Sequence, residues 1–291
     1  MRIGLIGTES DHADEFLRML NRESRHSGYR VNAIWGSGEE RTRNLARTYE
    51  VGTVAPTPDS MLGQVDAVIV GDRHGDLHLP HALPFLKAGL PVFVDKPLAC
   101  SVRDAETMLD AAEKSGALLT SASALRWQQI TDELVAGARR LGRPDRIVAT
   151  GSFYPDSEYG GLIFYGIHAT ELALQLAGAM VTDISVEKAE PYEVRLAMWA
   201  KSTEVVIRLL QPLPGEGTSF SAEMFKGDHQ VGRRVTLPDD YMAPVLDKFV
   251  AMIKTGKVPL SREELLMPVT LMEMAQAAFD DFRRQSDRRR A

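Results

Sequence analysis

A single cysteine, Cys100, is present among the 291 residues. One cysteine excludes an intramolecular disulfide framework and a zinc site built from several cysteines, and it is typical of a reducing, cytoplasmic compartment. Long apolar runs are also missing. The N-terminal stretch reaches acidic residues after about five apolar positions, and no later run approaches the roughly 18–20 residues of a membrane span. We therefore expect a cytoplasmic protein with neither a secretory signal nor a membrane partner.

Positive charge is in the minority, because 34 Lys and Arg residues stand against 40 Asp and Glu residues and the net charge is −6. A broad footprint for nucleic acid needs clustered positive charge, so we expect no DNA or RNA partner. The basic residues near the end, Arg283–Arg284 and Arg288–Arg290, are interpreted as cations that favour a helix C-terminus. With 44% apolar and 25% charged residues over this length, the composition indicates a globular chain of about two domains.

The first third of the chain alternates short apolar runs with amphipathic stretches. Strands that alternate with helices at this spacing predict right-handed βαβ units and a doubly wound parallel α/β sheet over residues 1–120. The expected strands are Arg2–Ile6, Arg30–Trp35, Val54–Ala55, Ala67–Gly71, Pro91–Val94 and Ala117–Thr120. The expected helices are Ala13–Asn21, Glu39–Tyr49, His81–Ala88 and Val102–Lys114.

The second half has a different pattern, in which turns join most of the strands. It predicts an α+β domain with a mostly antiparallel sheet over residues 121–291, whose last helices pack back on the first domain. Leu213–Gly217 is interpreted as a hairpin turn, the spacing of Ser261 and Glu264 predicts a capping box, and Pro268 is expected to start the last helix. The expected strands are Arg146–Ser152, Thr182–Lys188, Tyr192–Ala200, Glu204–Leu210 and Ser219–Lys226, and the expected helices include Gln129–Ala138, Ala169–Leu176 and Ala243–Lys254.

The turn after the first strand matches a dinucleotide-binding fingerprint in part. That fingerprint places glycines at positions 7, 9 and near 12, and this chain has Gly7 but carries Glu9 and His12 at the other two. The backbone N–H groups of the turn can still face a pyrophosphate, while the Glu9 carboxylate repels one unless its side chain turns away. The alternative is an ordinary strand-to-helix turn in which Ser10 or Asp11 caps the helix.

The end of the second strand normally carries an acidic residue that binds the ribose diol of NAD. Gly36 stands there, followed by Ser37, Arg41 and Arg43. Loss of the acid removes repulsion toward a 2′-phosphate, and a hydroxyl and an arginine can bind one, so we expect NADP slightly ahead of NAD. The alternative is a helix start capped by Ser37, with both arginines on a solvated face.

Asp95-Lys96-Pro97 follows a predicted parallel strand, at the sheet edge where open α/β folds bind ligands. Pro97 biases Lys96 away from helical dihedral angles and so restricts where its side chain points. A lysine at this edge is well placed to contact a nicotinamide ribose and a substrate oxygen. The alternative interpretation, which is simpler when the residue is considered alone, is that Lys96 is an ordinary solvated surface lysine.

The chain resembles the Gfo/Idh/MocA oxidoreductases. Asp95-Lys96-Pro97 is similar to the Glu/Asp-Lys-Pro motif of that family, and Gly166–Glu171 is similar to its G-x-H-x-x-D/E motif. The resemblance extends in order along nearly the whole chain, through the degenerate glycine turn, His78–Ala82, Arg126-Trp127 and a Tyr241–Gly256 helix. It implies an N-terminal Rossmann domain, an open-faced C-terminal domain, and NAD(P)-dependent oxidation or reduction of sugars, polyols or related carbonyl compounds.

The resemblance also implies roles for individual residues. Lys96 would polarise the reacting oxygen and His168 would move the hydroxyl proton, because its ordinary pKa lies near 6.5. Arg126, Tyr165 and Glu171 would join them around the substrate. The residues expected at the cofactor are Gly7, Thr8, Glu9, Ser10, His12, Gly36, Ser37, Arg41, Gly71, Asp72, His78, Asp95, Lys96 and Pro97.

The chain departs from the family at the site itself. Phe164 stands four residues before His168, where the family often has aspartate, and Asp72–Gly75 replaces the usual Thr-Pro-Asn turn. These losses keep open an alternative, a non-catalytic member that acts as a ligand sensor or assembly partner. A metal site is not expected, although four residues, His74, Asp76, His78 and His81, are spaced as possible ligands. Because an open sheet face is usually covered, a homodimer or homotetramer through the C-terminal sheet is expected.

Overall fold

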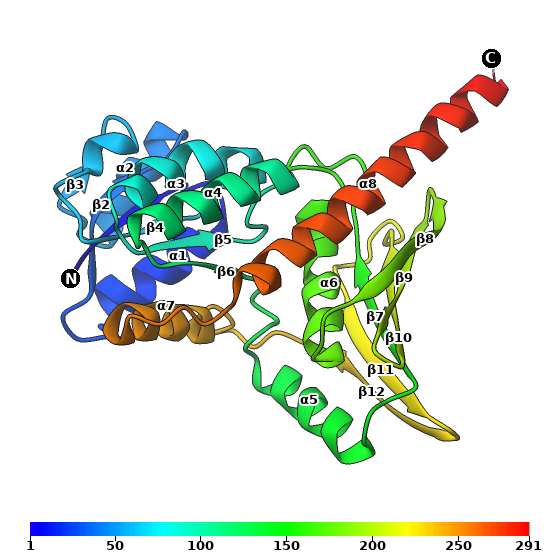
Figure 1. Cartoon of the computed structure of the whole chain (residues 1–291). Helices are drawn as coiled ribbons and strands as arrows, with labels where there is room; N and C mark the ends of the chain where they lie inside the picture. The colour runs from blue at the N-terminus through cyan, green and yellow to red at the C-terminus, as the bar shows by residue number, and fades with distance from the viewer. Residues whose placement is uncertain (291) are drawn as a thin grey trace. The chain divides into compact units, whose positions relative to one another are not determined.

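The structure, a computed structural model, describes residues 1–290, with side chains as far as residue 288. The chain forms two compact units: the first contains residues 1–122 and 240–266, and the second contains residues 123–239 and those from 267 onward. Each unit has a sheet and helices of its own (Figure 1). The expected domain limits, 1–120 and 121–291, stay a prediction that proteolysis would test.

The sheet of the first unit has six parallel strands in the order β3-β2-β1-β4-β5-β6. This is the strand order of doubly wound dinucleotide-binding folds, and it confirms the predicted fold class. Every residue of β4 and β5 is buried, as expected for parallel strands covered on both faces. The strands are β1 (Arg2–Ile6), β2 (Arg30–Trp35), β3 (Thr53–Val54), β4 (Ala67–Val70), β5 (Val92–Asp95) and β6 (Leu119–Ala122).

Helices cover both faces of this sheet, with α3 and α4 on one face and α1 and α7 on the other (Figure 1). The rings of Phe16 in α1 and Phe249 in α7 pack against Phe93 of β5, with centroids 5.8 and 5.9 Å apart. The helices are α1 (Asp11–Leu17), which continues as the π-helical η1 (Arg18–Arg22), α2 (Glu39–Thr48), α3 (His78–Lys87), α4 (Val102–Ser115) and α7 (Ala243–Thr255), with short 3-10 turns η2 (Asp59–Met61) and η3 (Gly75–Leu77).

The returning helix α7 is tied to the first unit by charge as well as by apolar packing. Arg25 donates two hydrogen bonds of 2.8 Å to the carboxylate of Asp247, and a ring nitrogen of His26 lies 2.8 Å from the same carboxylate. The guanidinium of Arg25 and burial act in opposite directions, and the net effect lowers the pKa of Asp247. The segment between η1 and β2 therefore holds α7 at the sheet.

The sheet of the second unit has the order β12-β11-β7-β10-β9-β8. The β7–β10 pair is parallel and the other pairs are antiparallel, so the prediction of a mostly antiparallel sheet is confirmed. Sequence patterns missed β12 because six of its seven residues are exposed and give no apolar alternation. The strands are β7 (Arg146–Ser152), β8 (Thr182–Glu190), β9 (Glu193–Ala200), β10 (Thr203–Leu210), β11 (Phe220–Lys226) and β12 (His229–Val235).

The expectation of a hairpin at Leu213–Gly217 is wrong. The segment does turn, because the Glu216 N–H donates to the Leu213 carbonyl at 2.9 Å. The strands that it connects, β10 and β11, are separated by β7 and do not pair with each other. Proline and glycine mark a change of direction, but they do not say which strand will lie alongside.

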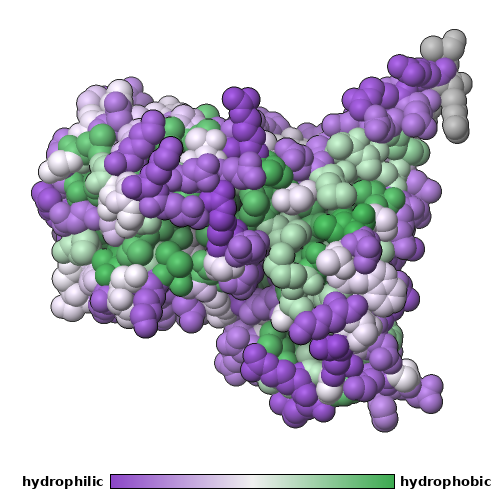
Figure 2. Space-filling view, in the orientation of Figure 1, coloured by the Kyte–Doolittle hydropathy of each residue, from purple (hydrophilic) through white to green (hydrophobic). Residues whose placement is uncertain are grey.

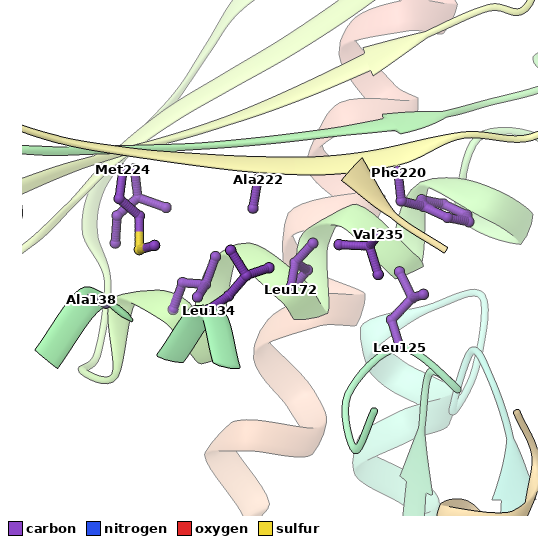
Figure 3. Close-up of a cluster of buried hydrophobic side chains, with 10 residues drawn as sticks. Leu125, Leu134, Ala138, Leu172, Phe220, Ala222, Met224 and Val235 are labelled. Atoms are coloured by element: carbon purple, nitrogen blue, oxygen red, sulfur yellow. The ribbon is translucent and has the colours of Figure 1, made fainter. Parts of the chain in front are cut away.

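One face of this sheet is covered by α5 (Gln129–Leu141) and α6 (Ile163–Ala177). Figure 3 shows apolar side chains of α5, α6 and β11 that point toward one another between the helices and the sheet. Burial of such side chains contributes roughly 1.5–3 kcal/mol each, which fixes α6 on the sheet. The fully or nearly fully buried members are Leu125, Leu134, Ala138, Ile147, Leu172, Leu176, Phe220, Ala222, Met224 and Val235.

The last helix, α8, runs from Arg262 to Arg290, so the expectation that Pro268 starts it is wrong. The capping box opens the helix instead: the Ser261 N–H donates to Oε2 of Glu264 at 2.9 Å, and the Glu264 N–H donates to Oγ of Ser261 at 3.2 Å. Pro268 lies inside and removes one backbone hydrogen bond. Burial of Val269 and Met272 outweighs that loss.

The surface near the end of α8 is polar. Figure 2 shows hydrophilic residues along its final turns, where Arg283 and Arg284 are exposed. Of the basic run Arg288–Arg290, the side chains of the last two residues lie outside the described part of the chain. Among the helices that the structure describes, none combines the length and the apolar character that crossing a membrane requires.

Candidate active site

The turn between β1 and α1 needs glycine at its first position. Gly7 has φ +86°, and a Cβ placed there would lie 2.3 Å from the backbone nitrogen of Asp72. The Gly7 N–H donates to the Trp35 carbonyl at 2.9 Å, which joins the ends of β1 and β2. The one glycine that the chain keeps from the fingerprint is therefore the one that lets three strand ends approach each other.

The Glu9 carboxylate turns toward the residue two places beyond the end of β2. Its Oε1 accepts hydrogen bonds from the N–H and the hydroxyl of Ser37, at 2.9 and 2.6 Å. Its Oε2 is shielded from solvent and has no hydrogen-bond partner among the described residues, and the same holds for Oγ of Ser10. Two neighbouring polar atoms of this turn thus have unused bonding capacity, which burial makes unfavourable unless a ligand supplies partners.

Gly36 has no room for a side chain. A Cβ there would lie 1.9 Å from Oγ1 of Thr8 and 2.7 Å from Oγ1 of Thr42. The two threonine hydroxyls share a buried hydrogen bond of 2.9 Å, and Thr8 is fully buried. The position that usually carries the ribose-binding acid is therefore closed by packing.

Arg41, which was expected at a 2′-phosphate, has its contacts within the fold. Its guanidinium donates to the carbonyl oxygens of Thr8 and Ser10 and forms an ion pair with Asp14. Arg43 likewise pairs with Glu39 on its own helix. Arg41 fastens the β1–α1 turn to α2, and its charge is balanced within the fold instead of being presented to a 2′-phosphate.

Asp95, at the end of β5, is buried and ionised. Its Oδ2 lies 2.5 Å from Nδ1 of His12, and its Oδ1 accepts the N–H of Lys96 at 2.9 Å. Burial favours the neutral acid, but the charge and hydrogen bond of His12 and the charge of Lys96 outweigh it and lower the pKa of Asp95 to about 2. His12, at the last fingerprint position, therefore binds the acidic residue of the Asp-Lys-Pro motif.

The backbone around Lys96 is held from the other side by His78. The ring nitrogens of His78 lie 2.7 Å from the Pro97 carbonyl and 2.9 Å from the Asp72 carbonyl, and the side chain is fully buried. Lys96 itself is 8% exposed. The ends of β4 and β5, two of the predicted cofactor positions, are thus joined by one histidine.

The structure groups the possible metal ligands differently from what their spacing in the sequence suggests. Both ring nitrogens of His78 face backbone carbonyls, and Nδ1 of His81 lies 2.8 Å from Oδ2 of Asp72. Within the described residues, His74, Asp76 and Cys100 bring their potential ligand atoms within 4.8 Å of one another. Burial, followed by the nearby Asp76 charge, raises the pKa of the Cys100 thiol to about 12, so the group is a protonated thiol at neutral pH. The expectation that the chain uses no metal stays a prediction.

The second unit gathers its own polar residues at the first turns of α6. Nδ1 of His168 lies 2.6 Å from Oγ of Ser123, and the Ser123 N–H donates to Oε1 of Glu171 at 2.9 Å. Arg126 lies 3.8 Å from the other oxygen of Glu171, and both side chains are 7% exposed. His168, Glu171 and Arg126 were expected near the substrate, and the structure places them in one connected network.

Aromatic rings line the other side of His168. Its ring centroid lies 5.9 Å from that of Tyr165 and 5.2 Å from that of Phe220. Phe164, at the place where an aspartate was expected from the resemblance, packs against the rings of Tyr159 and Tyr165. The surroundings of His168 therefore combine a hydroxyl and a carboxylate with an aromatic wall.

Sequence reasoning missed two residues, one in each unit, that contact predicted site residues. Ser123 follows the end of β6, so its place after a parallel strand was a usable signal. Thr42 lies inside α2 and bonds Thr8, and nothing in the local sequence marks it.

Comparison with known proteins identifies the first unit. The profile of one family, described as the oxidoreductase family with NAD-binding Rossmann fold (GFO_IDH_MocA), matches residues 1–123. The chain is 29% identical over 149 residues to 1,5-anhydro-D-fructose reductase of Ensifer adhaerens, which covers 49% of this chain and 43% of that protein. It is 30% identical over 129 residues to inositol 2-dehydrogenase/D-chiro-inositol 3-dehydrogenase of Shouchella clausii, which covers 43% and 36%. The matched regions span less than half of these curated relatives.

A solved structure extends the likeness to the whole fold. The crystal structure of myo-inositol dehydrogenase from Lactobacillus casei, in complex with NAD(H) and myo-inositol, has a TM-score of 0.78. The likeness covers 97% of this chain and 95% of that chain at 15% identity. The two chains therefore share a fold across both units.

Proposed function

We propose that this chain is a divergent member of the Gfo/Idh/MocA oxidoreductases and that it transfers a hydride between a nicotinamide dinucleotide and a sugar-like or polyol substrate or its carbonyl counterpart. One observation carries the proposal: the Asp95-Lys96 pair at the end of β5, with Asp95 buried, ionised and bound to His12. A buried charged pair at the carboxyl edge of a parallel sheet is typical of a functional site. The names of the two curated relatives, a sugar reductase and an inositol dehydrogenase, support this substrate class.

The residues of the first unit fit a dinucleotide. The strand order provides the sheet edge, at the carboxyl ends of the strands, where such folds bind dinucleotides. Gly7 lets the backbone approach the ligand closely, and the unpartnered Oε2 of Glu9 and Oγ of Ser10 offer polar contacts. When bound, the dinucleotide supplies or accepts the hydride. We propose that the residues expected from the sequence hold it, with the exception of Arg41, whose contacts lie within the fold.

We propose that Lys96 and His168 divide the polar chemistry of the reaction. The ammonium of Lys96 stabilises negative charge on the substrate oxygen, and the Lys96 backbone is fixed by its bond to Asp95. His168 moves the hydroxyl proton, with Ser123 orienting its ring through Nδ1. Phe164 replaces the usual aspartate, and in the second unit Ser123 contacts His168 directly while Glu171 contacts Ser123.

The alternative is a non-catalytic member that keeps the fold as a ligand sensor or assembly partner. The two functions separate in one experiment, in which NADH and NADPH are titrated into the chain and nicotinamide fluorescence is followed. Oxidised dinucleotide is then incubated with a panel of inositols and sugars. The oxidoreductase predicts binding and reduction of the dinucleotide with at least one polyol. Binding without turnover on any polyol or sugar favours the alternative, and the absence of binding contradicts the oxidoreductase and also favours the alternative.

The remaining expectations concern assembly, compartment and cofactor type. We propose a homodimer or homotetramer through the open face of the second sheet, and a cytoplasmic protein on the evidence of its single cysteine. The expected preference for NADP depended on Gly36, Ser37 and Arg41. In the structure Ser37 binds the Glu9 carboxylate and Arg41 pairs with Asp14, so that argument loses its support.

A further inference from the structure

The end of β2 has lost its acidic side chain but keeps a carboxylate. At Gly36 any side chain would overlap the hydroxyls of Thr8 and Thr42. The carboxylate that stands beside this position comes from Glu9, on the neighbouring β1–α1 turn. A different strand connection thus supplies the functional group that dinucleotide-binding folds place at this point.

The geometry of Glu9 leaves one oxygen for a ligand. Both donors of Ser37 bind Oε1, and Oε2 has no hydrogen-bond partner among residues 1–288. A carboxylate offers about four lone-pair positions, so its second oxygen can accept two hydroxyl groups. Because Oε2 is shielded from solvent, binding of a ligand there requires the Glu9 side chain to change its torsion angles so that this oxygen faces outward. A vicinal diol has two O–H donors that match it.

The charge of the residues around Glu9 is also unfavourable for a phosphate. Ser37, the partner of Glu9, is neutral, and the guanidinium of Arg41 is balanced by Asp14. A 2′-phosphate would bring about two negative charges next to the Glu9 carboxylate, and like charges in a partly buried site repel. A ribose with free hydroxyl groups meets no such repulsion.

We propose that Glu9 binds the adenosine ribose diol and makes this chain select NAD(H) over NADP(H). This inference rests on the proposed function, because it requires a dinucleotide on the first unit. Glu9 replaces the glycine of the fingerprint and at the same time replaces the missing acid at the end of β2. The carboxylate that sets cofactor specificity therefore comes from the turn after β1 instead of from the end of β2.

The test titrates NADH and NADPH into the full chain and follows nicotinamide fluorescence. ADP-ribose and its 2′-phosphate, which lack nicotinamide, are measured in parallel by calorimetry, so the readout is independent of turnover. The proteins are wild type, Glu9→Gln, Glu9→Ala and the control Glu40→Gln, which removes the same charge from the exposed first turn of α2. Glu9→Gln keeps an oxygen that can accept from Ser37, and thermal melting verifies that it folds.

Wild type and the control should bind NADH about 10- to 100-fold more tightly than NADPH, the range that a hydrogen bond to a charged group supports. Glu9→Gln and Glu9→Ala should lose most of that ratio, chiefly by binding NADPH and the 2′-phosphorylated ADP-ribose more tightly. Wild type that binds NADPH as tightly as NADH overturns the proposal. So does a Glu9→Ala variant that binds both dinucleotides more tightly, because Glu9 would then be an obstruction.

Failure of this proposal is distinct from failure of the proposed function. If both dinucleotides bind and the ratio of their affinities is unchanged in the Glu9 variants, the proposed oxidoreductase function is retained and the proposed role of Glu9 is refuted. If neither dinucleotide binds wild type or either variant, the proposed function itself is refuted and the role of Glu9 with it.

Discussion

Replacing Asp95 with asparagine removes the buried charge on which the proposed function depends. Asp95 is 4% exposed, and burial opposes its charge while His12 and Lys96 favour it, with a pKa of about 2 in the folded chain against an ordinary value of 3.8. Because the folded pKa is the lower one, ionised Asp95 stabilises the fold at every pH above the unfolded value, and this stabilisation is lost as the pH falls toward 2. At 1.36 kcal/mol per pKa unit, the contribution is about 2 kcal/mol from pH 4 upward and about 1 kcal/mol at pH 3.

The assay is urea unfolding of wild type and Asp95→Asn at pH 7, 5, 4 and 3. Trp35 reports on the first unit when the other two tryptophans, Trp127 and Trp199, are replaced by phenylalanine in both proteins. The variant should be less stable by about 2 kcal/mol at pH 7 and 5, and the gap should shrink at pH 3. A gap of equal size at pH 7 and 3 would show that the asparagine disturbs packing and not charge. Equal stability at pH 7 would refute the ionised pair itself.

Three further predictions concern single residues. Cys100, with a pKa of about 12, should react with iodoacetamide at pH 8 far more slowly than a free thiol and at a normal rate once the chain is unfolded in urea. Gly36→Ala should destabilise the first unit by roughly 1–3 kcal/mol through its overlap with Thr8, whereas the control Gly52→Ala, whose added Cβ meets no atom closer than 3.8 Å, should show a smaller loss in the same urea unfolding. His168→Ala should lower turnover by about 10²–10⁴-fold with NADH affinity unchanged, and Ser123→Ala should lower it less and shift the pH profile of kcat. An unchanged pH profile in the Ser123 variant would show that the serine does not act through the histidine.

The strands of the first unit follow from sequence because each is an apolar run that the fold buries on both faces. β4 and β5 are buried at every residue, so the sheet requires them to be apolar and the sequence shows this directly. β12 has no such requirement, since six of its seven residues face solvent, and local sequence patterns do not reveal it. Pro268 was misjudged for a related reason: helix propensity argues against an interior proline, and burial of Val269 and Met272 overrides it.

The site was harder to predict than the fold because its contacts join turns that are distant in sequence. Lys96, His168, Arg126 and Glu171 were predicted from motifs, but Ser123, which contacts His168 and Glu171, was not. Ser37 is 28 residues from Glu9, and Ser123 is 45 residues from His168. Single-residue expectations, such as a phosphate-binding Arg41, lose support when a neighbour such as Asp14 already balances the charge.

The strand order nevertheless contains information that a position-by-position comparison with the fingerprint leaves unused. In a sheet ordered β3-β2-β1-β4-β5-β6, the turn after β1 stands next to the turn after β2. A charged residue at a glycine position of the first turn therefore meets side chains of that neighbouring turn, as Glu9 meets Ser37. The last fingerprint position reaches past β4 to the end of β5, where His12 meets Asp95. Both departures from the glycine pattern are thus answered by polar partners at other strand ends. A fingerprint that looks degraded along the sequence is, in the folded chain, a set of paired substitutions around the same sheet edge.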